Sequence, residues 1–406
     1  MRTFAKSDKL HGVCYDVRGP VLDAANEMKR QGTEILQLNI GNPAPFGFQA
    51  PSWILDAIRD ALDDPMSQGY SESNGIVEAR EAILDYHRSK GLPNLEMNHI
   101  YIGNGVSEMI SLAMQGLLND GDEILIPAPD YPLWTAAAKL AGGTPVHYIC
   151  DEKSNWYPDI ADMEKKINSR TKGIVIINPN NPTGALYPKE VLEQIVELAR
   201  RHELILFADE IYDRLVMDGK KHTAIASLAP DVFCVSMNGL SKSHRICGFR
   251  VGWMVLSGPK KNVKGYIEGL NMLANMRLCA NVLSQHVIQT SLGGYQSVDE
   301  LLIPGGRIYE QREFITNTVN AIPGLSAVKP DAGLYIFPKI DRNMYDIEDD
   351  EEFCLRLLKK EKVLLVPGKG FNWNEPDHFR IVYLPRVEEL ADLGNKIERV
   401  LSYYKR

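Results

Sequence analysis

Short apolar runs alternate with amphipathic segments along most of the chain. Helical spacing of apolar residues occurs at Trp53–Leu62, Val77–His87 and Glu190–His202. Six runs have the length and composition of buried strands: Ile124–Ile126, Val146–Ile149, Gly173–Ile177, Leu204–Ala208, Phe233–Val235 and Trp253–Leu256. Buried strands that alternate with helices predict an α/β fold with a doubly wound, mostly parallel sheet.

The pattern changes in the last third of the chain. A long helix is predicted from Lys261 to about Thr290, followed by a segment that contains glycine and proline. Beyond it, a helix and the strands Leu334–Phe337 and Phe379–Tyr383 predict a smaller α+β domain, and the acidic run Asp346–Glu352 predicts a solvated helix start. We therefore divide the chain into an N-terminal arm that joins the small domain (1–45), a large domain (46–295) and a small C-terminal domain (296–406).

Composition and charge disfavour several classes of protein. The net charge of −8 over 406 residues disfavours a nucleic-acid-binding surface, which needs a basic excess. No apolar stretch approaches the length of a membrane span, and the first residues lack the apolar core of a signal peptide. The six cysteines are scattered, which favours reduced thiols over a disulfide framework or a zinc site. We expect a cytoplasmic protein without a metal, nucleic-acid or membrane partner.

Polar residues follow several predicted strands, where open α/β sheets bind their ligands. The turn Asn178–Gly184 contains Asn181, and Asp209 directly follows the apolar run Leu204–Ala208. Lys242 lies among small polar residues, with Arg250 eight positions later. An amine near phosphate-binding groups is what a site for an aldehyde cofactor requires. Simpler explanations are turn chemistry for the asparagines, a helix N-cap for Asp209 and a solvated loop for Lys242.

The segment Gly103–Glu108 is a glycine turn that opens a predicted helix. Such a turn presents free backbone N–H groups to a phosphate, although a capping box around Ser107 explains it equally well. The turn lacks the dinucleotide-binding fingerprint, which disfavours a nicotinamide dehydrogenase. Tyr131 follows a strand and could stack on a planar ring, whereas Trp134 is interpreted as core.

Taken in order, these residues resemble the fold-type I pyridoxal-phosphate aminotransferases of class I and II. The resemblance spans nearly the whole chain and is carried by Gly105-Val106-Ser107, Tyr131, Asn181-Pro182-Thr183-Gly184, Asp209 with Tyr212, Lys242, Arg250 and Arg380. Within the family, the bacterial glutamate–pyruvate (alanine) aminotransferases are most similar, through Tyr15–Pro20, Asn178–Gly184 and Met237–Lys242. The resemblance implies pyridoxal 5'-phosphate (PLP) as the cofactor of the large domain.

The resemblance also implies the roles of the cofactor-binding residues. Lys242 would bind the cofactor aldehyde as a Schiff base and then move the substrate α-proton. Asp209 would hold a proton on the ring nitrogen, while Asn181 and Tyr212 would hydrogen-bond the phenolic oxygen. The ring face and the phosphate would be contacted by Tyr131, Gly105, Val106, Ser107 and Arg250.

Substrate binding is implied for residues from both ends of the chain. Arg380 would hold the α-carboxylate in a bidentate fork, close to the backbone at Gly41 and to Asn181. Arg18, beside Tyr15, is our candidate for the distal carboxylate of glutamate.

Two further expectations concern the phosphate. Tyr70 matches the position from which family members reach the neighbouring subunit's phosphate, which implies a homodimer with shared active sites. Many relatives carry Ser or Thr three residues before the lysine as a phosphate ligand, whereas this chain has Gly239. Ser241 is the candidate that replaces this contact.

The implied function is ping-pong transamination between L-alanine and 2-oxoglutarate, with pyruvate and L-glutamate as products. A PLP-dependent C–S β-lyase is an alternative, as is an aminotransferase for other neutral or aromatic amino acids, because the same residues would hold the cofactor. A non-catalytic sensor attached to a DNA-binding module is disfavoured, because residues 1–45 are too short and not basic enough.

Overall fold

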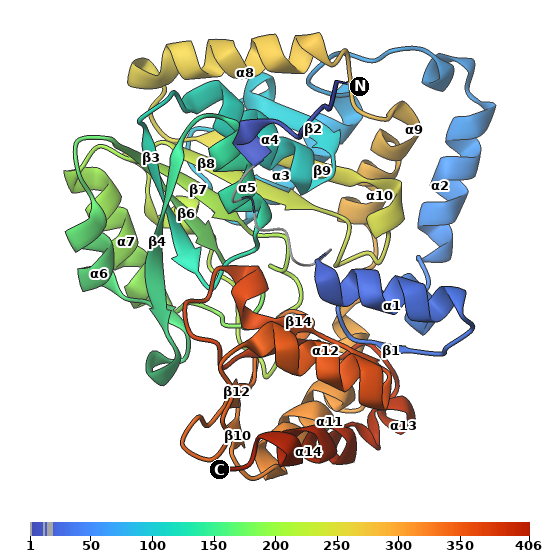
Figure 1. The fold of residues 1–406 in the computed structure, drawn as a ribbon. Coiled ribbons are helices and arrows are strands. Elements are labelled where there is room, and N and C mark those ends of the chain that lie inside the picture. The colour runs from blue at the N-terminus through green and yellow to red at the C-terminus, as the bar shows by residue number, and fades with distance from the viewer. Residues whose placement is uncertain (1, 11–12, 14–18) are drawn as a thin grey trace.

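A computed structural model describes residues 2–10, 13 and 19–406, and its centre is an eight-stranded sheet (Figure 1). The strand order is β2-β9-β8-β7-β6-β3-β4-β5. The strands are β2 (Ile100–Asn104), β3 (Glu123–Ala128), β4 (Thr144–Asp151), β5 (Tyr157–Pro158), β6 (Thr171–Ile177), β7 (Ile205–Asp209), β8 (Cys234–Gly239) and β9 (Val251–Ser257).

The predicted α/β fold with a mostly parallel sheet is confirmed. Strands β4, β3, β6, β7 and β8 pair in parallel, so their carboxyl ends meet at one edge. Strand β9 runs antiparallel to both of its neighbours, and β5 is antiparallel at the opposite edge of the sheet. The parallel centre therefore brings the residues that follow these five strands to the same edge of the sheet.

Alternating side chains of the central strands enter different cores on the two faces of the sheet. Ile124 and Ile126 pack with α4, α5 and α8, whereas Leu125 between them packs with α6 and α7. Helices α2, α3 and α10 cover the second face beside β2 and β9. The helices of this part are α2 (Ser52–Asp63), α3 (Val77–Ser89), α4 (Val106–Leu117), α5 (Leu133–Leu140), α6 (Ile160–Lys166), α7 (Lys189–Arg201), α8 (Lys264–Met276), α9 (Val282–Gln285) and α10 (Val287–Gly293).

The long helix predicted from Lys261 to about Thr290 is wrong, because the structure has three separate helices there. Helix α8 ends at Met276, and Leu278 adopts a left-handed conformation with φ of 70°. Arg277 turns back to bind the Glu108 carboxylate at 2.8 Å and the Ile102 carbonyl at 2.7 Å. These tertiary contacts end the helix where its apolar spacing alone would continue it.

A second core is formed by α1 and the C-terminal elements (Figure 1). Its three small sheets pair β1 with β13, β10 with β12, and β11 and β14 with β15. The helices are α1 (Pro20–Arg30), α11 (Arg307–Ala321), α12 (Asp350–Glu361), α13 (Val387–Leu390) and α14 (Leu393–Leu401). The strands are β1 (Leu36–Gln37), β10 (Leu325–Ser326), β11 (Tyr335–Ile336), β12 (Lys339–Ile340), β13 (Val363–Leu364), β14 (Val366–Pro367) and β15 (Phe379–Val382). The boundaries at 45 and 295 stay predictions.

The acidic run at 346–352 does start a helix, but it is not wholly solvated as predicted. Asp349 caps α12 by accepting a hydrogen bond from the Glu351 amide. Asp350 is buried and accepts a hydrogen bond from the Lys369 amide at 2.9 Å. Burial raises the pKa of Asp350 to about 6. One acid of the run is therefore part of the interior.

The C-terminal part lies against the carboxyl ends of the parallel strands. The Asp130 amide, just after β3, donates a hydrogen bond to the Phe371 carbonyl at 2.9 Å.

Within the described residues, no helix is long and apolar enough to cross a membrane.

Candidate active site

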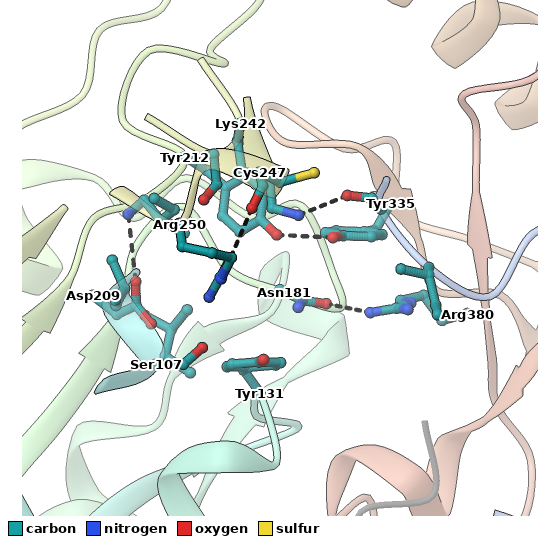
Figure 2. A pocket seen from close by; sticks show the side chains of 16 residues that line it. Ser107, Tyr131, Asn181, Asp209, Tyr212, Lys242, Cys247, Arg250, Tyr335 and Arg380 are labelled. Carbon is teal, nitrogen blue, oxygen red and sulfur yellow. Dashed lines mark hydrogen bonds between the residues drawn. The ribbon is translucent and has the colours of Figure 1, made fainter. Parts of the chain in front are cut away.

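A cavity of about 440 Å³ lies where the carboxyl ends of the strands meet the C-terminal part (Figure 2). Most of the described residues predicted for the site line it: Gly41, Val106, Ser107, Tyr131, Asn181, Asp209, Tyr212, Ser241, Lys242, Arg250 and Arg380. Gly105 is not among the lining residues but directly precedes Val106 in the sequence. Tyr70 is 82% exposed and is not among the lining residues. Tyr15 and Arg18 lie outside the described residues.

Lys242 extends into the cavity from the turn that follows β8. Its Nζ donates a hydrogen bond to the Gly41 carbonyl at 2.6 Å. The side chain lines the cavity and is half-buried, which disfavours the alternative of a freely solvated loop lysine. The fold thereby joins the amine to a backbone segment 201 positions earlier in the chain.

Asp209 is a buried carboxylate at the end of β7. Its Oδ2 accepts a hydrogen bond from Trp134 Nε1 at 3.1 Å, and its Oδ1 accepts one from the Ile211 amide at 3.4 Å. Burial raises the pKa of Asp209 to about 6, despite these two bonds. The helix N-cap interpretation is wrong, because a turn rather than a helix follows the residue. A cationic group in the cavity would relieve the cost of this buried charge.

One end of the cavity is built from the start of α4 and from Arg250. The N-cap of α4 is Gly105, with φ of 83° and no side-chain cap, so the capping-box interpretation of Ser107 is wrong. The amides of Val106 and Ser107 belong to the first helical turn, where N–H groups have no intrahelical acceptor. Arg250 donates to the carbonyls of Cys247 and Asn104 at 2.9 and 3.3 Å.

Two glycines permit this close packing. A Cβ on Gly105 would overlap the Arg250 guanidinium, and a Cβ on Gly252 in β9 would overlap the first turn of α4. Free N–H groups, a helix dipole and a guanidinium meet at one point, and this combination suits a phosphate group.

Arg380 enters the opposite end of the cavity from β15. Its Nη1 donates to Asn181 Oδ1 at 2.8 Å, and its Nη2 donates to the Asn39 carbonyl. The guanidinium carbon lies over the rings of Tyr335 and Phe371, at 4.4 and 4.6 Å from their centroids. A buried arginine held in this way is oriented to bind a carboxylate.

The other asparagines of the Asn178–Gly184 turn do what turn chemistry predicts. Asn178 Oδ1 accepts a hydrogen bond from the Tyr187 amide, and Asn180 Oδ1 accepts two from Thr183. Asn181 differs from them, because it faces the cavity and Arg380. Trp134 is a core residue as interpreted, and its indole N–H also orients Asp209.

Sequence reasoning missed Tyr335 and Cys247, which both line the cavity. The Tyr335 hydroxyl lies 2.8 Å from that of Tyr212, and Cys247 Sγ donates to Asn42 Oδ1 at 3.3 Å. The sequence pattern places Tyr335 only in a strand, where an aromatic residue is core filler by default. Cys247 follows Lys242 by five positions, and this nearness in sequence is the signal that could have found it.

Gly239 is explained by the pairing of β8 with β9. A Cβ at this position would lie 2.6 Å from the Val251 carbonyl oxygen and 3.0 Å from Gly252 Cα, which are both backbone atoms. A serine does not fit here without movement of β9. Ser241 is buried against the cavity, where a hydroxyl is accommodated, and its role as a phosphate ligand stays a prediction.

Gly239→Ser is therefore expected to destabilise the protein rather than to add a phosphate contact. Forcing a side chain against the backbone of β9 is expected to cost about 1–3 kcal/mol. Urea unfolding measures this loss. Gly265→Ser is the control, because a Cβ there meets no atom within 4 Å. Equal stability of the two variants would contradict this explanation of Gly239.

Comparison with known proteins agrees with this geometry. The family model for aminotransferase class I and II matches residues 33–397. Glutamate-pyruvate aminotransferase AlaA of Haemophilus influenzae is 59% identical over the full length of both chains. An alanine aminotransferase of Mycobacterium tuberculosis is 53% identical, over 100% of this chain and 94% of its own length. A crystal structure of an aminotransferase from Escherichia coli superposes with a TM-score of 0.98, at 57% identity and full coverage of both chains. The chain therefore belongs to the class I and II aminotransferases.

Proposed function

We propose that this enzyme transfers the amino group between L-alanine and 2-oxoglutarate, with PLP as its cofactor. The observation that carries the proposal is the position of three groups around one cavity. The buried Asp209 carboxylate has only neutral donors in its two hydrogen bonds, and it lines the same cavity as Lys242 and as the first turn of α4 with Arg250 (Figure 2). Relatives at 53–59% identity carry the names alanine and glutamate-pyruvate aminotransferase, which supports the choice of substrates.

The residues of the cavity fit PLP in charge and in hydrogen bonding. When bound, PLP supplies an aldehyde that condenses with amines and a ring that withdraws electrons from the α-carbon. Asp209 would hold a proton on the ring nitrogen, and that positive charge offsets the cost of its burial. Arg250 and the first turn of α4 would bind the phosphate, while Tyr131 would cover the ring face.

Proton transfer is assigned to Lys242. Its amine would bind the cofactor's aldehyde carbon, and after displacement by substrate it would carry the proton to and from the substrate α-carbon. Its hydrogen bond to the Gly41 carbonyl keeps the amine on the side of Arg380 and the substrate. Tyr212 and Asn181 would hydrogen-bond the ring's phenolic oxygen.

The substrate α-carboxylate would bind Arg380 near the backbone of Gly41. Gly41 has no room for a side chain, because a Cβ there would overlap the Tyr335 hydroxyl. Among the described residues that line the cavity, the cationic side chains are Lys242, Arg250 and Arg380, and each already has a role. The distal carboxylate of glutamate therefore needs a cation from elsewhere, and we assign this function to Arg18.

Arg18→Ala is expected to raise the KM for glutamate about 10-fold while the KM for alanine changes less than about 2-fold. Glutamate has a second carboxylate for Arg18 to bind, whereas alanine has none. Steady-state kinetics with each amino donor measures the difference, and Arg2→Ala serves as the matched control in the same segment. Equal increases for both substrates would contradict the assignment.

We also propose a homodimer with shared active sites, in a cytoplasmic location. Tyr70 is exposed on this chain, as a side chain that reaches a partner subunit's phosphate must be. The five described cysteines are free, which is usual in a reducing compartment. Sedimentation of the cofactor-loaded protein tests the dimer.

A panel of amino donors with pyruvate and with 2-oxoglutarate as acceptors tests the substrate assignment. Alanine with 2-oxoglutarate is expected to give the highest kcat/KM. A preference for other neutral or aromatic donors would overturn the alanine assignment. Pyruvate and ammonia formed from cystathionine without any acceptor would instead indicate a C–S β-lyase.

A further inference from the structure

Tyr335 contacts Arg380 and Tyr212, two residues that line the cavity. Its ring lies against the Arg380 guanidinium, and its hydroxyl forms a 2.8 Å hydrogen bond with the Tyr212 hydroxyl (Figure 2). The side chain is buried, and Gly41 leaves it space by lacking a Cβ. A single residue therefore joins the arginine proposed to bind substrate to the tyrosine proposed to bind the cofactor ring.

The direction of the hydrogen bond between the two phenols determines what Tyr212 can do. A phenol has one hydrogen, so Tyr212 can donate to a ligand only if it accepts from Tyr335. Burial by itself would raise the pKa of Tyr335, but Lys242 and Arg380 lower it below its ordinary value. Burial and the neighbouring Tyr335 raise the pKa of Tyr212. Either hydroxyl can donate across the 2.8 Å pair, and a ligand oxygen that takes the Tyr212 hydrogen leaves Tyr335 as the donor to Tyr212.

The ring of Tyr335 has a separate effect on Arg380. The ring centroids of Tyr335 and Phe371 lie 4.4 and 4.6 Å from the guanidinium carbon of Arg380. Two aromatic rings therefore hold the orientation of the guanidinium. The Phe371 carbonyl accepts a hydrogen bond from the amide of Asp130, the residue before Tyr131. Both aromatic neighbours of Arg380 are thus anchored to residues on the cofactor side of the cavity.

We propose that Tyr335 is a positioning residue with two functions. Its hydroxyl turns the Tyr212 hydrogen toward the cofactor's phenolic oxygen, and its ring keeps the Arg380 guanidinium in place for the substrate carboxylate. The inference rests on the proposed function, because both targets belong to the PLP-dependent reaction. The hydroxyl and the ring can be removed separately, so the two functions can be tested separately.

Tyr335→Phe removes the hydroxyl and keeps the ring. A weaker hydrogen bond from Tyr212 would stabilise the anionic phenolic oxygen less. The pH midpoint at which the visible absorption of the cofactor-loaded protein titrates is therefore expected to rise by about half a unit or more. We expect kcat to fall about 3- to 10-fold, with KM for alanine and for 2-oxoglutarate within about 2-fold of the wild type.

Tyr335→Leu removes the ring as well, so KM for both substrates is expected to rise about 5- to 20-fold. Tyr345→Phe is the matched control, since Tyr345 is buried outside the cavity and donates to the Pro323 carbonyl at 2.8 Å. A Tyr335→Phe protein with the midpoint and kcat of the control would overturn the inference, even if Tyr335→Leu fails to fold. A wild type without transaminase activity would instead overturn the proposed function.

Discussion

Lys242→Ala is expected to lower transamination by at least about 10³-fold, because the variant loses the amine that we propose binds the cofactor and moves the α-proton. The purified wild type should be yellow, whereas the variant should lack the absorption of the lysine-bound cofactor. Absorption spectra and single-turnover assays measure the two losses separately.

Lys165→Ala is the control for Lys242→Ala, since Lys165 is exposed on α6. It should keep the wild-type spectrum and activity. An active Lys242→Ala protein would contradict the assignment of this lysine, and so would a variant that retains the wild-type visible band.

Asp209→Asn is expected to have opposite effects on activity and on stability. Loss of the carboxylate that we propose holds the ring-nitrogen proton should lower kcat about 10²-fold or more. The cofactor-free variant should nevertheless be more stable than the cofactor-free wild type at pH 7.5, by about 1–2 kcal/mol, since a buried and unpaired charge is removed.

The sign of this stability effect follows from the pKa of Asp209. In the folded protein its pKa is raised from 3.8 to about 6, so the folded state binds the proton more tightly than the unfolded state. This tighter proton binding stabilises the folded wild type by at most about 3 kcal/mol. The stabilisation is complete below pH 3.8 and is lost as the pH rises through about 6. The stability that Asp209→Asn adds relative to the wild type should therefore be large at pH 7.5 and small at pH 5.

Urea unfolding of the cofactor-free proteins at the two pH values measures this difference. Asp350→Asn is the matched control, because burial also raises the pKa of Asp350 to about 6 and this residue lies outside the cavity. It should show the same pH pattern of stability with unchanged activity. A pH-independent stability change in Asp209→Asn would contradict the explanation.

Much of the fold could be predicted from local patterns. Each predicted strand of the central sheet is present, because buried strands in a parallel sheet are apolar on both faces and therefore stand out in sequence. The break after Met276 could not be predicted, since it depends on contacts of Arg277 with residues about 170 positions earlier in the chain. The burial of Asp350 could not be predicted either, because this residue belongs to an acidic run and only tertiary contacts place it in the interior.

The candidate site was predictable where residue chemistry is unusual for its position. An acid at the end of an apolar strand needs a partner, and this rule drew attention to Asp209, which is buried and lines the cavity. Tyr335 was missed because a buried aromatic residue in a strand has no distinctive pattern. Gly239 looked like a missing ligand, whereas its true constraint is the backbone of β9, which only the pairing of the strands reveals.

The most direct test of the central claim is a half-reaction. The cofactor-loaded protein is mixed with L-alanine in the absence of any 2-oxo acid, and pyruvate and ammonia are measured. An alanine transaminase should release one pyruvate per active site and stop, without ammonia, until 2-oxoglutarate restarts it and glutamate appears in equal amount. No pyruvate, or continued turnover with release of ammonia, would contradict the account.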